Sequence, residues 1–488
     1  MKKIILPATI LLLMTTEAAV VQSAPKSRVI PNNPSKIIYD SLDWTVPLGE
    51  PYRNELKNGC VVYIAEDSQL PLVKITAYIR DGSLADPPGK EGLTSLMAKM
   101  LRSGGTKKFP ADTLDDLIGL LALRMGFSAH ESQLTFKGSF LTEYSDNAFT
   151  ILEELFFHPV FDAKKLEKER KIVLESIRHR FDNPGPTLGI AFEKSMYPGQ
   201  PPGRLSTESS IKSITRKDLV DLHRSLFYPG NIIFCIAGKF NRDTMKTRLE
   251  KLFSTTAASG RTTVFPKVSV NRTPVCLLVH KAISQAYVRL GLPLFQRPHP
   301  DYYSMSVLNL ILGGDGFTSR LGKKIRSDAG LTYSIHSEAQ SNYVYPATFY
   351  INFFTKNASF AQAVELSLKE VRLFVENGVS EEELTNAKSS LIDELPSMFR
   401  SPDDIVATYG WNEYYHRAPD HFKVYPEKIR AITREDIARV ARKYLNVDSM
   451  SITVVGDTTQ LIRLKSGEFS LANFPRNTIL PDAIPRLP

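Results

Sequence analysis

The sequence predicts an α+β fold built from two homologous domains, each a largely antiparallel sheet covered by helices. Three observations predict this class. One stretch of the chain recurs at a constant offset, short segments alternate apolar with polar residues as half-buried strands do, and longer segments carry apolar residues at helical spacing. Strands followed by helices and then by further strands are typical of a sheet covered by helices.

The internal repeat predicts the division of the chain into two domains. The hexapeptide Ile214–Leu219 recurs as Ile432–Ile437, with Glu435 in place of Lys217 and Ile437 in place of Leu219. The same ungapped offset aligns five identical pairs: Leu166 with Leu384, Phe181 with Phe399, Pro184 with Pro402, Tyr197 with Tyr415, and Gly238 with Gly456. We therefore expect an N-terminal domain over 37–253, a linker over 254–273, a C-terminal domain over 274–470, and a proline-rich tail over 471–488.

The first copy reads as strands separated by helices. Alternation predicts strands over Val73–Ile79 and Leu134–Phe136, and the apolar spacing of Leu93–Leu101 predicts a helix between them. A long charged helix is predicted from Asp162 to Phe181, ending before a proline-rich break. Thr215 is expected to cap a further helix, after which a strand over 232–237 closes the domain.

The second copy repeats this order. Its predicted strands have apolar residues bounded by polar or turn residues, and they are Val275–Val279, Ala286–Leu292, Leu331–Ser337, Thr348–Phe354 and Ser451–Val455. A helix is expected from Glu381 to about Arg400, broken at Pro402.

Composition excludes several classes of protein. The 488 residues are 42% hydrophobic, enough for substantial cores, and the net charge of +9 is spread without a basic cluster or a nucleic-acid motif, so no nucleic-acid partner is expected. Three cysteines exclude a disulfide scaffold. Cys60, Cys235 and Cys276 each lie in short apolar runs, which predicts buried thiols on strands, and their spacing matches no zinc motif.

The first residues read as an export signal. Lys2 and Lys3 precede the apolar run Ile4–Met14, and small residues around Ser23 suit cleavage, so residues 1–23 are predicted to be a signal peptide. Retention of this segment as an anchor stays open. Nothing later in the sequence is long and apolar enough to span a membrane. We expect the mature protein in a bacterial periplasm.

Several ordered motifs carry a resemblance to a known family. They are Asn58–Tyr63 opening the first domain, Gly92-Leu93 starting a helix, Arg102–Thr106 after it, Pro159–Phe161, and Lys168–Arg170. Together with the duplication, they resemble the pitrilysin/insulysin family of zinc peptidases, which includes the mitochondrial processing peptidases. The resemblance covers nearly the whole mature chain and implies a zinc motif H-x-x-E-H just after Gly92-Leu93.

The catalytic motif is absent at that place. Aligned with H-x-x-E-H, the two histidines fall on Ser95 and Lys99 and the glutamate on Ala98, while the family's third ligand falls on Ser176. A hydroxyl, a methyl and an ammonium can neither hold a zinc ion nor take a proton from water. A shift of register would offer Glu175 as the third ligand without restoring the histidines. We expect no catalytic residue, metal or cofactor in this chain.

A second family feature is retained. The segments Ser319–Leu321, Ile325-Arg326 and Gly330–Ser334 resemble the family's C-terminal domain, in which an arginine and a tyrosine hold the peptide near the scissile bond. The resemblance implies a substrate-binding role for Arg326 and Tyr333. A guanidinium and a phenol are suitable donors to a peptide carbonyl or to the oxyanion that develops on it.

Three functions remain open on the sequence alone. The first is a non-catalytic subunit of a heteromeric zinc peptidase, in which an H-x-x-E-H homologue supplies the zinc and this chain closes the chamber and contributes Arg326 and Tyr333. The second is a pseudoenzyme that acts as a scaffold or binds short or unfolded peptides, with an edge strand near Ala129–Lys137 taking up an extended peptide. The third is an autonomous peptidase with unusual ligands.

Overall fold

The computed structural model describes residues 33, 36–37, 44–253, 263–467 and 469–471. The predicted signal peptide, the first part of the predicted linker and nearly all of the predicted tail lie outside these residues. The chain divides into two units, Met1–Thr45 and Val46–Pro488, and every helix and strand given below belongs to the second. No helix in the described part of the chain is long and apolar enough to cross a bilayer.

The first half forms a sheet with one parallel pair of strands. Its order is β1-β2-β6-β3-β5-β4. In that order the strands are Arg53–Glu55, Val61–Glu66, Ile232–Gly238, Leu72–Arg80, Gln133–Leu141 and Arg124–Ala129. β2 and β6 pair in parallel and the neighbours pair antiparallel, which leaves β4 at one edge. The predicted strands over 73–79, 134–136 and 232–237 are confirmed within β3, β5 and β6.

The second half repeats this topology. Its strand order is β7-β11-β8-β10-β9, with ranges Cys276–His280, Ser451–Gly456, Gln285–Pro293, Thr348–Lys356 and Ile335–Ala339. β7 and β11 form the parallel pair and β9 lies at the edge, so each strand corresponds to one of β2, β6, β3, β5 and β4. The α+β class and the duplication are thereby confirmed.

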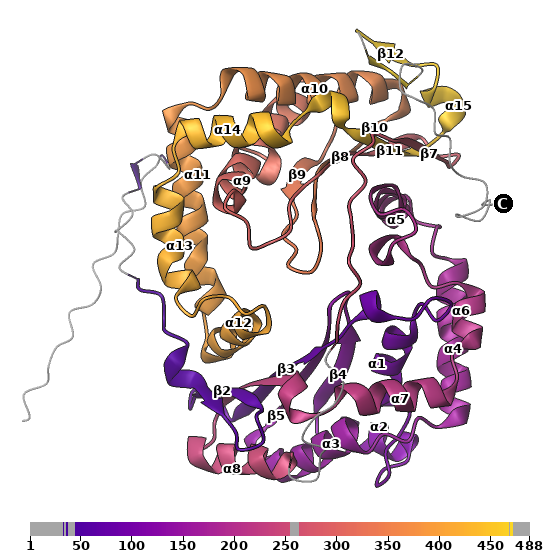
Figure 1. Cartoon of the computed structure of the whole chain (residues 1–488), viewed down its shortest axis with the longest axis vertical. Helices are drawn as coiled ribbons and strands as arrows, with labels where there is room; N and C mark the ends of the chain where they lie inside the picture. The colour runs from indigo at the N-terminus through magenta and orange to yellow at the C-terminus, as the bar shows by residue number, and fades with distance from the viewer. Residues whose placement is uncertain (1–32, 34–35, 38–43, 254–262, 468, 472–488) are drawn as a thin grey trace, which may run out of the picture. The chain divides into compact units, whose positions relative to one another are not determined.

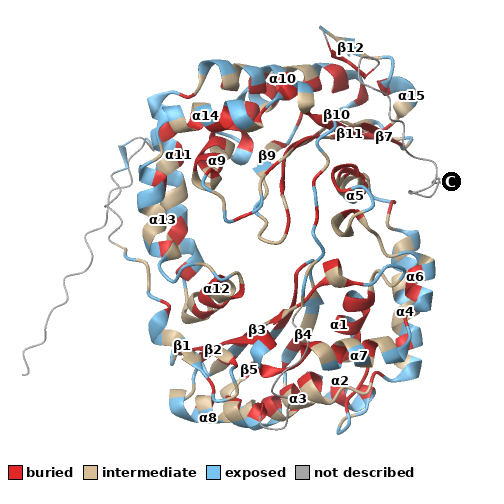
Figure 2. Cartoon of the chain, viewed as in Figure 1, coloured by how far each residue is buried: buried red, intermediate tan, exposed pale blue. Residues whose placement is uncertain are grey.

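Helices cover both sheets (Figure 1). In the first half they are α1 (Leu93–Ser103), α2 (Ala111–Leu120), α3 (Ser145–Phe157), α4 (Ala163–Arg178), α5 (Pro184–Met196), α6 (Glu208–Ser213), α7 (Arg216–Leu226) and α8 (Arg242–Leu252). In the second half they are α9 (Tyr302–Asn309), α10 (Phe360–Asn377), α11 (Glu381–Glu394), α12 (Pro402–Tyr414), α13 (His421–Arg430), α14 (Arg434–Tyr444) and α15 (Thr458–Leu461). Figure 2 shows the buried residues in red along the strands and along the covering faces of the helices.

One helix of each half packs on the sheet of the other half. Leu188 and Ala191 of α5 join a buried cluster with Leu277 and Val279 of β7 and with Val455 of β11. In return α12 packs on β2, β3 and β6. The two helices begin at the prolines that the repeat aligns, so the exchange follows the internal duplication.

Two prolines begin helices at places where the sequence predicted only the end of the preceding helix. Pro184 and Pro402 are the first residues of α5 and α12, because a fixed φ and a missing N–H suit the first helical position. The helix expected to reach Arg400 is α11, which ends at Glu394 and continues as a short 3₁₀ turn over Leu395–Phe399.

Two expectations about strands change in detail. The strand expected over 331–337 begins only at Ile335, since Thr332 Oγ1 accepts from the backbone N–H of Ser334 and makes a local turn. Cys235 and Cys276 are buried thiols on strands as predicted, whereas Cys60 is buried just before β2. None of the three is in a disulfide.

Candidate functional site

Helix α1 carries the degenerate motif, and Ser95 of that motif lines a cavity. Gly92 precedes the helix with a φ of 100°, a left-handed conformation that favours glycine. The buried Asp86 carboxylate caps the helix, accepting from the N–H groups of Gly92 at 2.8 Å and Thr94 at 3.0 Å. Burial is the main cause that raises the pKa of Asp86, to about 6, although these hydrogen bonds oppose the rise.

The four motif positions cannot hold zinc. Ser95 and Lys99 are exposed one turn apart on α1, while Ala98 is buried against the sheet with 2% of its surface exposed. Ser176 is exposed on α4, which packs against α1. These side chains provide no imidazole and no carboxylate, so the residues do not fit the metal that the family's motif would hold. Among the described residues no group of three or more His, Cys, Asp and Glu side chains is placed to bind a metal.

Glu175 forms hydrogen bonds with neighbouring residues at the C-terminal end of α4. Its Oε1 lies 2.9 Å from Nε2 of His179, and its Oε2 accepts from Arg178 at 3.2 Å. His179 Nδ1 lies 2.7 Å from Asp182. The hydrogen bond from His179 lowers the pKa of Glu175, and the bonds to Asp182 and Glu175 raise the pKa of His179. The carboxylate that a register shift would recruit is thus held in an exposed ion cluster.

Arg326 and Tyr333, which the family resemblance paired, lie close together. Arg326 lies on the π-helical segment η8 (Gly322–Asp328), which is anchored by the fully buried Ile325. Its guanidinium carbon is 5.3 Å from the ring centroid of Tyr333. Tyr333 is 78% exposed, because the buried Thr332 beside it fixes the segment by donating to the carbonyl of Phe354.

A third residue completes this surface. The ring centroid of Phe317 lies 3.9 Å from the Arg326 guanidinium, and Phe317 is 69% exposed. Arg326 also donates to the carbonyl of Gly316, at 3.5 Å. The ring covers one face of the cation and leaves other N–H groups for a ligand. Phe317 carries no motif of its own, and sequence reasoning missed it; an exposed aromatic before Ser319–Leu321 was the available signal.

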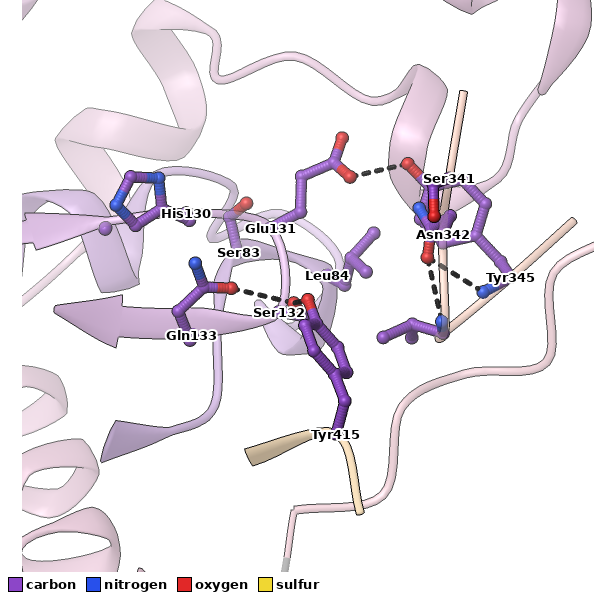
Figure 3. A pocket seen from close by; sticks show the side chains of 12 residues that line it. Ser83, Leu84, His130, Glu131, Ser132, Gln133, Ser341, Asn342, Tyr345 and Tyr415 are labelled. Atoms are coloured by element: carbon purple, nitrogen blue, oxygen red, sulfur yellow. Dashed lines mark hydrogen bonds between the residues drawn. The ribbon is translucent and has the colours of Figure 1, made fainter. Parts of the chain in front are cut away.

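A polar cavity of about 450 Å³ opens where the two edge strands end. It is lined by the turn between β4 and β5, by the connection between β9 and β10, and by Tyr415 (Figure 3). Glu131 on one side accepts a hydrogen bond from the hydroxyl of Tyr345 on the other. Burial raises the pKa of Glu131 despite that bond. Corresponding loops of the two repeats therefore meet at one cavity.

Comparisons with known proteins agree with this architecture. Residues 61–201 match the family model described as insulinase (peptidase family M16), and residues 213–391 match the model described as peptidase M16 inactive domain. A crystal structure of the peptidase M16 inactive domain from Pseudomonas fluorescens has a TM-score of 0.73 at 23% identity, covering 83% of this chain and 98% of that one. The periplasmic protease PqqL from Escherichia coli has a TM-score of 0.70 at 17% identity, covering 88% and 48%.

Curated relatives match over most of their length. The uncharacterized zinc protease YmxG of Bacillus subtilis is 24% identical over 401 residues, which is 81% of this chain and 96% of that protein. The non-peptidase homolog YmxG of Helicobacter pylori is 25% identical over 409 residues, 83% and 93% of the two chains. With both repeats matched and the zinc motif replaced, the chain belongs to the insulinase family, peptidase family M16, as an inactive, peptidase-like member.

Proposed function

We propose that this chain is the non-catalytic subunit of a heteromeric zinc peptidase. A homologue that carries H-x-x-E-H supplies the metal and the general base, and this chain closes the chamber and binds the peptide. The proposal is supported by the loss of every zinc-binding side chain at Ser95, Lys99 and Ser176, and by one relative, the YmxG of Helicobacter pylori, that is named a non-peptidase homolog.

The observation that carries the proposal is the pair formed by the half-buried Arg326 and the exposed Tyr333. A guanidinium and a phenol that lie side by side offer several N–H and O–H donors to one peptide carbonyl. A chain that binds no zinc has no chemical use of its own for an oxyanion donor. The retained pair is therefore explained by substrate held against a partner's metal.

Reconstitution tests the proposal. Alone, the purified chain is expected to cleave no unstructured peptide, and mixing it with an H-x-x-E-H homologue should restore cleavage. Arg326→Ala and Tyr333→Phe should each lower turnover about tenfold or more, because a donor to the developing charge is lost. Analytical ultracentrifugation should show that both variants still assemble with the partner.

The matched control lies on the same segment. Lys324 is an exposed cation two residues from Arg326 and pairs with Asp328 at 3.1 Å. Lys324→Ala removes a charge from the same surface and should leave turnover unchanged. Full activity in both Arg326→Ala and Tyr333→Phe would refute the assigned roles, and one zinc ion per isolated chain would refute the non-catalytic assignment.

A peptide-binding pseudoenzyme is the second candidate. The edge strand expected near Ala129–Lys137 lies instead at Arg124–Ala129, because residues 133–137 belong to the interior strand β5. This function is favoured by β4, which has no strand on its outer side among the described residues, and by the polar cavity at its end (Figure 3). An extended peptide would add to β4 through backbone hydrogen bonds. This function predicts that the isolated chain binds unstructured peptides and that no H-x-x-E-H homologue co-purifies with it.

The proposal also places the chain in the periplasm. It is supported by the charged and then apolar start of the sequence, which reads as a cleavable signal peptide. The test is cell fractionation with mass spectrometry of the mature N-terminus. A chain that keeps Met1 in the cytoplasmic fraction would refute this placement.

A further inference from the structure

A second cavity, of about 240 Å³, opens beside Ser95 at the degenerate zinc position. Its walls include Arg180, which comes just after α4, and Arg204 and Ser206 from the turn before α6. We call it the Arg180 pocket. Two guanidinium groups and the hydroxyls of three serines, Ser83, Ser95 and Ser206, thus line a pocket beside one of the four degenerate motif positions.

Among the residues that the structure describes, no carboxylate pairs with Arg180. Its two terminal nitrogens donate to Ser206, to the carbonyl at 2.7 Å and to Oγ at 2.8 Å, and both acceptors are neutral. Burial lowers the pKa of Arg180. The pKa of the half-buried Lys194 is lowered by burial and then by the charge of Arg180. The positive charge of Lys194, which does not line the pocket, therefore lies near that of Arg180.

The acidic residues of the pocket are engaged elsewhere. Asp86 caps α1, where its carboxylate accepts hydrogen bonds from two backbone N–H groups and from the Thr94 hydroxyl. Glu91 Oε1 accepts from the backbone N–H of Gly89 at 3.0 Å on the exposed side. Formally the two guanidinium groups of Arg180 and Arg204 balance the carboxylates of Asp86 and Glu91, so the pocket suits a ligand with one negative charge better than a doubly charged phosphate.

The replacements on α1 and α4 change the site in the same direction. Two imidazoles and two carboxylates of the family's motif have become Ser95, Lys99, Ala98 and Ser176. The groups that attract a metal ion are gone, and Lys99 adds a positive charge one turn from the pocket. The motif positions of α1 and α4 therefore carry more positive charge than the zinc-binding motif of the family.

We propose that the Arg180 pocket binds a carboxylate group of a peptide. The Arg180 fork provides directed N–H donors for the planar anion, and Ser95 and Ser206 provide hydroxyls. The carboxylate comes from the C-terminus of the peptide or from an Asp or Glu side chain. This inference goes beyond the proposed function and does not depend on it, since it concerns the isolated chain without a partner.

Calorimetric titration of the full chain tests the proposal. Three N-acetylated Gly/Ser/Ala peptides are compared: one with a free C-terminal carboxylate, one with a C-terminal amide, and one amide with Asp as its last residue. A peptide that offers a carboxylate should bind about tenfold tighter than the plain amide, as expected for charge-assisted hydrogen bonds to arginine. The two carboxylate peptides distinguish the C-terminal from the side-chain source.

Variants locate the binding. Arg180→Gln should remove the preference for the carboxylate. Ser95→Glu leaves Arg180 in place but puts a competing carboxylate at the pocket, and it should remove the preference as well. Arg463→Gln is the control, since it takes the same charge from an exposed position in the second half of the chain and should change nothing.

The outcomes separate clearly. Equal binding of all three peptides, or a carboxylate preference that survives both Arg180→Gln and Ser95→Glu, overturns the proposal. Competition by inorganic phosphate at concentrations where acetate has no effect also overturns it. Because no proteolysis is measured, this result stands apart from the reconstitution experiment, and either proposal can fail alone.

Discussion

Gly410 shows how closely the two halves approach at single residues. It lies in α12, and a Cβ at this position would stand 2.1 Å from Sγ of Cys235 in β6. We expect Gly410→Ala to destabilise the protein by about 1–3 kcal/mol, because the added methyl overpacks a buried contact. Urea unfolding measures the loss.

Two further variants make that prediction specific. Gly119 lies in α2 with open space around its Cα, so Gly119→Ala should be neutral or slightly stabilising. Adding Cys235→Ala to Gly410→Ala should recover part of the lost stability, because the sulfur is removed from the clash. A Gly410→Ala protein as stable as the unaltered chain would contradict the packing described here.

Phe317 offers a prediction at the substrate-binding surface. Its ring lies on the Arg326 guanidinium and restricts it. In the reconstituted peptidase, Phe317→Ala should lower turnover about three- to tenfold, less than Arg326→Ala, because the cation remains but loses its orientation. Phe317→Tyr keeps the ring and should keep the activity. Steady-state kinetics on one peptide compares the three variants.

At the scale of elements, the repeated hexapeptide is a helix cap in both halves. Thr215 Oγ1 accepts from the N–H of Asp218, and the Asp218 carboxylate accepts from the N–H of Thr215; Thr433 and Asp436 repeat this box. Thr215→Ala and Thr433→Ala should each cost about 1 kcal/mol of stability, and the corresponding serine variants much less. Thermal unfolding of the four variants checks this, and equal losses for Ala and Ser would contradict it.

The elements that the sequence predicted correctly are those with strong local signals. The alternation of Val73–Ile79 and the apolar spacing of Leu93–Leu101 located β3 and α1, and Thr215 located the start of α7. Pro184 and Pro402 were understood as breaks because a proline prevents helix before it, whereas its suitability as a first helical residue depends on the residues after it. The strand at Ile335 began late because a turn at Thr332 outweighs the apolar pattern.

Only those residues of the candidate site that belong to a family motif could be predicted from the sequence. Arg326 and Tyr333 were found through their flanking residues, and the degenerate zinc positions through their spacing. The Arg180 pocket could not be found, because its walls come from segments before α1, after α4 and before α6 that only folding brings together. Phe317 was missed for a different reason: it stands just before the family-like segment Ser319–Leu321, but the sequence does not show that its ring reaches Arg326.

At the scale of the whole molecule, a half-buried carboxylate between the halves makes stability depend on pH. Glu193 of α5 has its pKa raised to about 7, first by burial and then by the nearby charge of Glu131, while Arg289 of β8 opposes the rise. In the folded state it keeps a proton that the unfolded chain releases above about pH 4.5. Stability contributed by this group is therefore lost as pH rises through the window from about 4.5 to 7.

Glu193→Gln should remove this loss. The amide resembles the protonated acid, so the variant should gain on the order of 1–3 kcal/mol over the unaltered chain at about pH 8 and little at about pH 4. Glu376→Gln, at an exposed position in α10, is the control and should give no pH-dependent gain. Urea unfolding at the two pH values measures the difference, and an equal gain at both would contradict this origin.

The reciprocal placement of α5 and α12 bears on how such a chain arises and breaks. A gene encoding a single repeat would produce a protein with one uncovered sheet face and one helix without a sheet to pack against. In a dimer of such proteins, the helix of each copy would cover the sheet of the other. Joining the copies in one polypeptide turns that concentration-dependent association into an intramolecular one. Severing the chain between the repeats should therefore yield fragments that are aggregation-prone apart and regain a folded complex when mixed.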